Sequence, residues 1–215
     1  MRFVKLLLAT LMVLGIAGMA QAEELKIEGS TTVTPIIEHA MGVYMAAHPD
    51  VKIVLSGTGS GDGIKALIEG HIDIAMASRL IKDKEVKMAE ENGVTPVEHV
   101  IAGDALTAVV HPSCPIDGLT MQQLQDIYSG KTTNWSEVGG PDLPIAVHSR
   151  ESSSGTYGSW NGKVLGKGDD APRLTPDAQT VSSNGAMAAA IANNPNGIGY
   201  IGLGFVDETV KALSV

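Results

Sequence analysis

The sequence predicts an α/β fold in two lobes, and two observations lead to this prediction. Short apolar runs of strand length alternate with longer segments of helical periodicity, and the chain is long enough for two small lobes once a predicted leader is set aside. In the first half we predict strands at residues 25–28, 51–55, 72–76, 97–101 and 106–110, and helices at 35–48, 63–70 and 82–92. This β-α-β order predicts largely parallel sheets with ligand sites at the carboxyl ends of the strands.

The second half continues the pattern after the loop "HPSCPIDG" at residues 111–118. There we predict helices at residues 121–128 and 185–193, a further helix that opens near Ser154, and strands at 145–147 and 198–201. The sequence shows no internal repeat, charge run or low-complexity tract.

The first 22 residues have the order of a secretory signal peptide. Arg2 and Lys5 precede an apolar run at residues 6–17, and small residues follow up to an expected cleavage site after Ala22. The apolar run is too short to span a bilayer comfortably. We therefore expect a mature chain that is soluble in the periplasm and has no lipid anchor, because no cysteine lies directly after the cleavage site.

The composition excludes nucleic acid as a partner. The formal net charge of −9 becomes −11 without the leader, which carries two basic residues and no acidic one, and such a chain is repelled by nucleic-acid phosphates. Cys114 is the one cysteine, so no internal disulfide is expected and a small buried hydrophobe is its favoured role. The six histidines show no metal-ligand spacing, so we predict neither a metal site nor a cofactor.

Three turns share one chemistry. They are "GSTTVTP" at residues 29–35, "SGTGSGDG" at 56–63 and "SRESSSGT" at 149–156, and each follows a predicted strand and opens a predicted helix. In each turn a Ser or Thr side chain can cap the helix, while glycine lets the backbone come close to a ligand. Because helix N-termini carry partial positive charge, the three turns together predict a receptor for an oxyanion. Any one of them alone is also typical of a simple helix cap.

Two arginines accompany these turns. Arg150 lies inside the third turn and has a planar fork suited to the oxygens of phosphate or sulfate. Arg79, in "MASR" after the third strand, is either a second ligand or a surface cation that pairs with an acid such as Asp83. The second turn lacks the Lys-Ser/Thr of a nucleotide-binding P-loop. The third lacks the first glycine of G-x-S-x-G, so a hydrolase nucleophile elbow is not supported.

Five segments carry a resemblance to a known family: "GSTTVTPIIEHAMGVYMAAHPDVKI", "GTGSGDGIKALIEGHIDIAMASR", "LQDIYSGKTTNWSEVGG", "SRESSSGTY" and "NPNGIGYIGLGF". In this order, over nearly the whole chain beyond the leader, they resemble the phosphate-binding protein of Pst-type ABC importers. The resemblance implies a periplasmic-binding-protein type II fold. This fold has two α/β lobes with mixed sheets flanked by helices, a hinge of crossing strands, and a cleft that closes over phosphate.

The resemblance also implies a set of ligand-binding residues. Carried over position by position, these are Thr31 and Thr32 in the first turn, Ser60 in the second, and Arg150, Ser154, Gly155 and Thr156 in the third. Well-known members have an aspartate after the third strand that accepts the proton of phosphate, whereas this chain has Ser78 followed by Arg79, as in subfamilies with Ser-Arg here. Both residues are included as ligand candidates. The secondary candidates are Ser30, Asp62 and Ser153. Asp62 and Glu151 are the nearest replacements for the acceptor in sequence, and Asp62 is favoured.

The same resemblance divides the chain. We expect a signal peptide at residues 1–22, the first part of lobe I at 23–104, lobe II at 105–199, and a return to lobe I at 200–215. Family members usually run on for some tens of residues after this point, so the return segment is expected to be incomplete.

The expected function is capture of inorganic phosphate for delivery to an ABC permease in the inner membrane, by a monomer. Two alternatives stay within binding: a receptor for another tetrahedral oxyanion such as sulfate, molybdate or tungstate, and a sensor subunit that passes its loaded lobes to a signalling partner. The enzyme alternative is a secreted phosphatase or serine hydrolase that uses Ser153 or Ser154. It is disfavoured because no histidine or acid is spaced to activate either serine.

Overall fold

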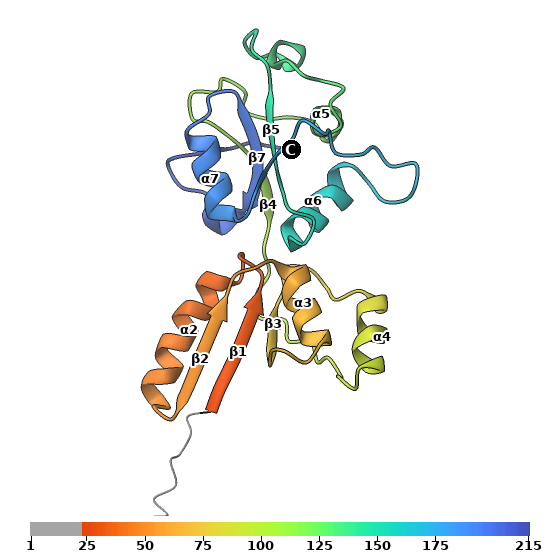
Figure 1. The fold of residues 1–215 in the computed structure, drawn as a ribbon. Coiled ribbons are helices and arrows are strands. Elements are labelled where there is room, and N and C mark those ends of the chain that lie inside the picture. The colour runs from red at the N-terminus through yellow and green to blue at the C-terminus, as the bar shows by residue number, and fades with distance from the viewer. Residues whose placement is uncertain (1–22) are drawn as a thin grey trace, which may run out of the picture.

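The computed structural model describes residues 23–215, which form an α/β fold of two lobes, each built around its own sheet. We call residues 23–92, which hold the first sheet, lobe I, and residues 106–215, which hold the second, lobe II. The lobes lie end to end, and residues 93–105 join them (Figure 1). The signal peptide predicted at residues 1–22 lies outside the described residues.

The sheet of lobe I is parallel, with the strand order β2-β1-β3. Its strands are β1 (Glu23–Gly29), β2 (Val51–Ser56) and β3 (Ile74–Met76), and its helices are α2 (Thr34–Ala47), α3 (Ser60–Ile68) and α4 (Asp83–Glu91). Ile27 of the central strand pairs with Leu55 on one side and Ile74 on the other. Because the three strands run in one direction, their carboxyl ends meet at one edge, and this edge faces lobe II (Figure 1).

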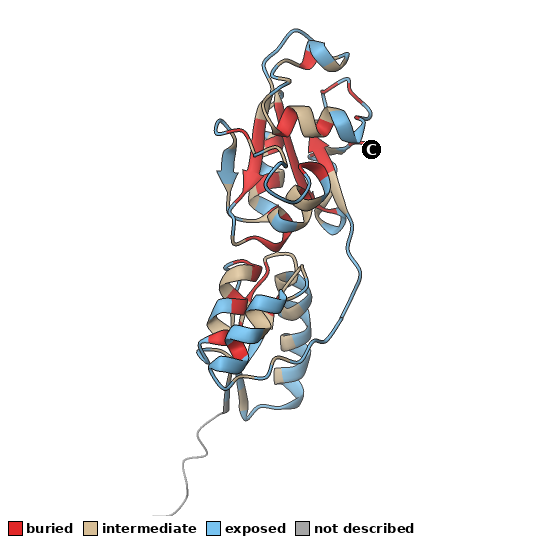
Figure 2. Cartoon of the chain, turned by 90° about the vertical axis from the view of Figure 1, so that its right-hand side faces the viewer, coloured by how far each residue is buried: buried red, intermediate tan, exposed pale blue. Residues whose placement is uncertain are grey.

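Lobe I has a small buried core. Ile64 and Ile68 of α3 and Ala89 of α4 form its buried cluster, and α2 buries none of its residues. Figure 2 shows the contrast, because the three strands at residues 106–110, 146–150 and 197–202 of lobe II are buried along most of their length whereas lobe I is mostly intermediate or exposed. Hydrophobic burial therefore stabilises lobe II more than lobe I.

Lobe II has a mixed sheet with the strand order β6-β5-β7-β4-β8. Its strands are β4 (Leu106–Val110), β5 (Ala146–Arg150), β6 (Gln179–Val181), β7 (Gly197–Gly202) and β8 (Lys211–Ala212). Its helices are α5 (Met121–Tyr128), α6 (Gly155–Val164) and α7 (Asn184–Ala192), with 3-10 helices η1 (Trp135–Val138) and η2 (Leu203–Phe205). All six residues of β7 are buried, as is typical of a central strand covered on both faces. None of the helices in residues 23–215 is long and apolar enough to cross a membrane.

An aromatic stack fixes α6 on the sheet of lobe II. The rings of Trp160 on α6 and Tyr200 on β7 are stacked, with centroids 4.6 Å apart and planes inclined by 7°. Tyr128 of α5 meets the Trp160 ring edge-on at 5.3 Å. Because all three side chains are buried, this packing holds the N-terminus of α6 in a fixed position relative to β5 and β7.

The expected return of residues 200–215 to lobe I is wrong. The strand β8 pairs with β4, and the backbone N–H of Leu213 donates to the carbonyl of Ala108 at 2.9 Å. Val210 and Leu213 are buried in lobe II. The edge of β4 that faces away from β7 accepts these backbone hydrogen bonds, so the segment completes the second sheet.

The predicted strand at residues 97–101 is also wrong. This segment pairs with no strand in the described part of the chain and belongs to the link between the lobes, where Val97, Val100 and Ile101 are exposed. An apolar run becomes a strand only where a neighbour can take its backbone hydrogen bonds. The other predicted strands and helices overlap observed elements, whereas β6, β8 and the 3-10 helices were not predicted.

The core of lobe II generates the first prediction. Leu124 of α5 has no exposed surface, so Leu124→Ala should lower the free energy of unfolding by about 2–5 kcal/mol through lost burial and a cavity. The matched control is Leu80, which is 71% exposed. Leu80→Ala should change the free energy of unfolding by less than about 0.5 kcal/mol. Urea unfolding measures both. Equal losses in the two variants would contradict the assignment of the core.

Candidate anion-binding site

The three turns predicted from the sequence meet where the two lobes face each other. Turn 1 (residues 29–35) and turn 2 (56–63) belong to lobe I, and turn 3 (149–156) belongs to lobe II. The backbone N–H of Gly61, at the start of α3, donates to the carbonyl of Ser153 at 2.7 Å, so the lobes are in direct contact here. The helices α3 and α6 both begin at this junction (Figure 1).

Turn 1 requires glycine at its first position. Gly29 has a φ of +137°, and a Cβ atom there would overlap the carbonyl of Met76. The close approach lets the Ser30 N–H donate to that carbonyl at 2.9 Å, while the Ser30 hydroxyl accepts from the Thr32 N–H at 3.2 Å. Ser30, which is 1% exposed, therefore stabilises the turn itself.

The two threonines of turn 1 contact lobe II. The hydroxyl of Thr31 accepts from Nη2 of Arg150 at 3.1 Å, and the hydroxyl oxygens of Thr32 and Thr156 lie 3.2 Å apart. We predicted that a hydroxyl of this turn caps the following helix, and this is wrong, because Val33 holds the N-cap position and no side chain caps α2. The threonine hydroxyls are used across the interface instead.

Turn 2 also lacks the predicted side-chain cap. Its N-cap residue is Gly59, with a φ of +119°. The hydroxyl of Ser60, which is fully buried, accepts from the Ser78 N–H at 3.0 Å and lies 3.3 Å from the Ser78 hydroxyl. Asp62 lies in the first turn of α3, where its charge complements the helix N-terminus, and in residues 23–215 it makes no hydrogen bond to these hydroxyls.

Turn 3 caps its helix as predicted. Ser154 is the N-cap residue of α6, and its hydroxyl accepts from the Tyr157 N–H at 3.2 Å. A Cβ atom on Gly155 would lie 2.5 Å from the hydroxyl oxygen of Ser78 and closer still to that of Ser60. Only glycine therefore lets the N-terminus of α6 come this close to the two serines of lobe I.

Arg150 is the cation of this junction. It ends β5 and is 3% exposed. Its Nε donates to the carbonyl of Val181 at 3.2 Å, and its Nη2 donates to the carbonyl of Ser182 at 2.8 Å as well as to Thr31. Its Nη1 is buried and has no hydrogen-bond partner within residues 23–215.

The charge of Arg150 is not balanced by an acid in direct contact. No carboxylate in the described part of the chain forms an ion pair with it. Burial lowers the pKa of Arg150, while Tyr200 and Glu151 oppose this shift. Arginine nevertheless stays protonated in proteins. A buried cation with an unused N–H is costly, and a bound anion that accepts from Nη1 would remove that cost.

The guanidinium of Arg79 forms no hydrogen bond with the other site candidates in residues 23–215. It donates to both carboxylate oxygens of Glu85 at 2.8 Å and to the carbonyl of Leu80 at 3.0 Å. The partner is thus Glu85 rather than the expected Asp83. Burial acts to raise the pKa of Glu85, but hydrogen bonds from Arg79 and from the Lys82 N–H outweigh it and lower the pKa.

The sequence predictions missed two buried residues of the junction. Asn184, the first residue of α7, donates from Nδ2 to the hydroxyl of Thr32 at 2.9 Å. Tyr200 accepts from the Arg150 N–H at 3.1 Å, and burial raises its pKa to about 12. Asn184 had a signal that could have found it, because "SSNG" at residues 182–185 is a fourth polar turn that follows a strand and opens a helix.

A cavity of about 430 Å³ adjoins the turns. The hydroxyl-bearing residues Ser78 and Thr156, one from each lobe, line it together with Ser159 and Lys163 of α6. Two residues of the junction therefore border this cavity, whose lining also includes the acidic side chain of Asp104.

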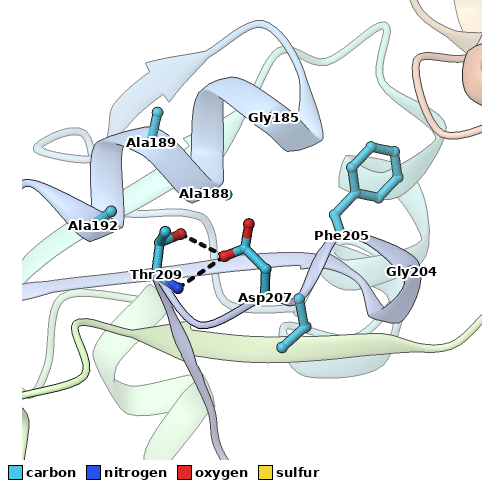
Figure 3. Close-up of a pocket in the computed structure, with 9 residues that line it drawn as sticks. Gly185, Ala188, Ala189, Ala192, Gly204, Phe205, Asp207 and Thr209 are labelled. Atoms are coloured by element: carbon cyan, nitrogen blue, oxygen red, sulfur yellow. Dashed lines mark hydrogen bonds between the residues drawn. The ribbon is translucent and has the colours of Figure 1, made fainter.

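A second groove lies away from the turns. Figure 3 shows this groove of about 510 Å³ between α7 and residues 203–209. Its α7 wall consists of small residues, and its one charged side chain, Asp207, accepts hydrogen bonds from the backbone N–H and the hydroxyl of Thr209. An acidic, mostly apolar groove is unsuited to an anion, and none of the predicted site residues lines it.

Comparison with known proteins identifies the family. Residues 17–214 match the family model described as a PBP superfamily domain. The chain belongs to the PBP superfamily. A similar solved structure, from Clostridium perfringens, is assigned as a phosphate ABC transporter substrate-binding protein and contains bound phosphate. It has 38% sequence identity and a TM-score of 0.78, and the match covers 89% of this chain and 75% of that chain.

Curated relatives extend the comparison. The phosphate-binding protein PstS of Staphylococcus epidermidis is 37% identical over 189 residues, which are 86% of this chain and 56% of the relative. Protein SphX of Synechococcus elongatus is 33% identical over 205 residues, which are 91% of this chain and 60% of the relative. The resemblance to Pst-type phosphate-binding proteins is confirmed, and with it the two-lobed fold class. The chain spans less than two thirds of the length of these two relatives.

The close approach at turn 3 generates a prediction on lobe closure. Gly155→Ala should hold the lobes further apart, because its Cβ overlaps two serines of lobe I. The matched control is Gly158→Ala on the same helix, whose nearest heavy atom would be Cδ of Arg79 at 3.9 Å. Small-angle scattering should show a larger radius of gyration for Gly155→Ala only. Equal radii for both variants and the parent would contradict this contact.

Proposed function

We propose that this chain binds inorganic phosphate between its lobes and is the receptor that delivers it to an ABC permease. One observation carries the proposal: the buried Nη1 of Arg150 has no partner within residues 23–215, and it belongs to the side chain that links turn 1 to lobe II. The family supports the ligand, since the Clostridium perfringens relative contains bound phosphate. The proposed ligand residues are Thr31, Thr32, Ser60, Ser78, Arg150, Ser154, Gly155 and Thr156.

The interactions of such a site can supply enough free energy to bind phosphate with micromolar affinity. A charge-assisted hydrogen bond contributes roughly 1.5–3 kcal/mol and a helix N-terminus roughly 0.3–1 kcal/mol. One guanidinium, several hydroxyls and the N-termini of α3 and α6 together can exceed the roughly 8 kcal/mol of micromolar binding. The net charge of −9 does not oppose this, because fixed local dipoles and one cation replace the water that phosphate loses.

Binding rather than hydrolysis is the role that the serines of turn 3 support. The hydroxyl of Ser154 serves as the cap of α6, and the carbonyl of Ser153 accepts from lobe I. A serine nucleophile needs an adjacent base. The nearest histidine in sequence, His148, is buried with its Nδ1 3.1 Å from the carbonyl of Ala146.

The receptor acts in the periplasm as a monomer and hands phosphate to a permease in the inner membrane. Two features support this location and partner: the leader pattern at residues 1–22, and the similarity to a Vibrio cholerae protein described as an ABC-type phosphate transport receptor, with 35% identity. Closure of two lobes over one ion gives a permease a shape that differs between loaded and unloaded receptor.

Arg150 gives the direct test of this function. Arg150→Ala should weaken phosphate binding by at least about 100-fold, because the dianion loses its buried charge partner. Arg150→Lys should weaken it by at least about tenfold, since an ammonium does not reproduce the planar fork. Isothermal titration calorimetry measures both, with Arg173→Ala, at an exposed arginine, as the control. Affinity of Arg150→Ala within threefold of the parent would refute the assignment, and equal binding of sulfate by the parent would favour a general oxyanion receptor.

Arg79 should behave differently. Arg79→Ala should leave phosphate affinity within about threefold, because its donors are used by Glu85 and Leu80. It should lower stability at neutral pH by roughly 1–3 kcal/mol, because the side chains of Arg79 and Glu85 are only 14% and 15% exposed and Glu85 loses its charged partner. Since the pair lowers the pKa of Glu85, this stability is present above the ordinary value of 4.5 and is lost as the pH falls below it. Calorimetry and thermal melts from pH 7 downward test this, and a tenfold loss of affinity would return Arg79 to the ligand set.

A further inference from the structure

Asn184 occupies a special position at the junction. It is fully buried and begins α7 directly after the N-cap residue Ser183. The carbonyl of Ser182 accepts from Arg150, and the side chain of Asn184 donates to Thr32 of lobe I. One short segment of lobe II thus holds both the cation and a hydroxyl of the proposed phosphate site.

A backbone hydrogen bond within lobe II fixes the orientation of the Asn184 side-chain amide. The backbone N–H of Gly202, at the end of β7, donates to Oδ1 of Asn184 at 3.2 Å. A backbone N–H can only donate, so the atom that faces it is the amide oxygen and the atom 2.9 Å from the Thr32 hydroxyl is the amide nitrogen. Position 184 therefore presents a donor to Thr32 and never an acceptor.

The donor role of Asn184 determines how many hydroxyl groups of the site are free to donate a hydrogen bond to an anion. The hydroxyls of Thr32 and Thr156 bring one proton each, and their 3.2 Å contact uses one of the two. Because Asn184 supplies its own proton to Thr32, the second hydroxyl proton remains to donate to an anion. An acceptor at position 184 would take the proton of Thr32 and leave the pair with one fewer donor for the anion.

We infer that Asn184 is a positioning residue that leaves one hydroxyl proton of the Thr32–Thr156 pair free to donate to phosphate and ties lobe I to the central strand of lobe II. The inference rests on the proposed function, since it names phosphate as the ion that accepts this hydrogen bond. It adds to the proposed ligand set a residue that acts through Thr32 rather than by touching the ion. The bridge from Gly202 through Asn184 to Thr32 crosses between the lobes, so it forms only when they are closed.

The test separates the donor of Asn184 from its volume. Asn184→Leu keeps the size of the side chain, removes its donor and acceptor and adds no charge, whereas Asn184→Asp replaces the donor by an acceptor that also repels a dianion. If Asn184 orients the hydroxyls, phosphate affinity by calorimetry should fall at least about tenfold in Asn184→Leu and further in Asn184→Asp. If Asn184 only fills space, Asn184→Leu should keep phosphate affinity within threefold of the parent, and this result would overturn the inference.

Matched controls separate positioning from folding. Asn193→Asp and Asn193→Leu carry the same changes at the other end of α7, where the side chain is exposed and donates to the carbonyl of Ala189, and both should keep phosphate affinity within threefold. Melting temperatures without phosphate are measured for all variants. A loss of affinity matched by the same loss in both Asn193 variants would overturn the inference, and absence of phosphate binding by the parent would instead refute the proposed function.

A measurement on the parent protein covers the case in which the Asn184 variants do not fold. The side-chain NH₂ resonances of Asn184 should be protected from solvent exchange and should shift when phosphate is added, whereas those of the exposed Asn193 should not. Unshifted Asn184 resonances in a protein that binds phosphate would overturn the inference.

Discussion

The buried guanidinium of Arg150 is the constraint on which the junction of the two lobes depends. Two carbonyls of lobe II and one hydroxyl of lobe I hold it, no acid in residues 23–215 pairs with it, and one of its nitrogens has no partner there. Such an arrangement is costly, and a negative group that shares the site would remove this cost. Around it the two lobes bring hydroxyls and helix N-termini, which are the groups that favour an anion.

The two lobes contribute unequally to this arrangement. Lobe II has the larger core, and within it the stack of Trp160 on Tyr200 holds α6, while the Tyr200 hydroxyl accepts from the Arg150 backbone. Contacts within lobe II thus hold the backbone and most of the guanidinium of Arg150, together with one helix N-terminus. Lobe I adds the hydroxyls of turns 1 and 2 through a small number of polar contacts, which suits an interface that opens and closes.

The sequence predicted those parts of the site that depend on local chemistry. The glycines and hydroxyls of the three turns and the fork of Arg150 could be found because each lies next to a strand end, and parallel strands bring their carboxyl ends together. The side-chain caps predicted for α2 and α3 are absent because the hydroxyls of turns 1 and 2 have partners distant in sequence, across the interface or at Ser78, which a local rule does not include.

The features that depend on contacts distant in sequence were predicted less well. The partner of Arg79 differed by two positions, since Glu85 rather than Asp83 faces it from the first turn of α4. Asn184 was missed because its importance comes from Gly202 and Thr32, which are distant in sequence. Likewise, an apolar run at residues 97–101 does not show whether a partner strand exists.

The most direct measurement is a crystal structure of the protein grown with phosphate. The account predicts one phosphate between the lobes, with an oxygen within hydrogen-bond distance of Nη1 of Arg150 and others near the Thr156 hydroxyl and the N-terminus of α6. Phosphate bound elsewhere, with Nη1 of Arg150 still lacking a phosphate oxygen, would contradict the central claim.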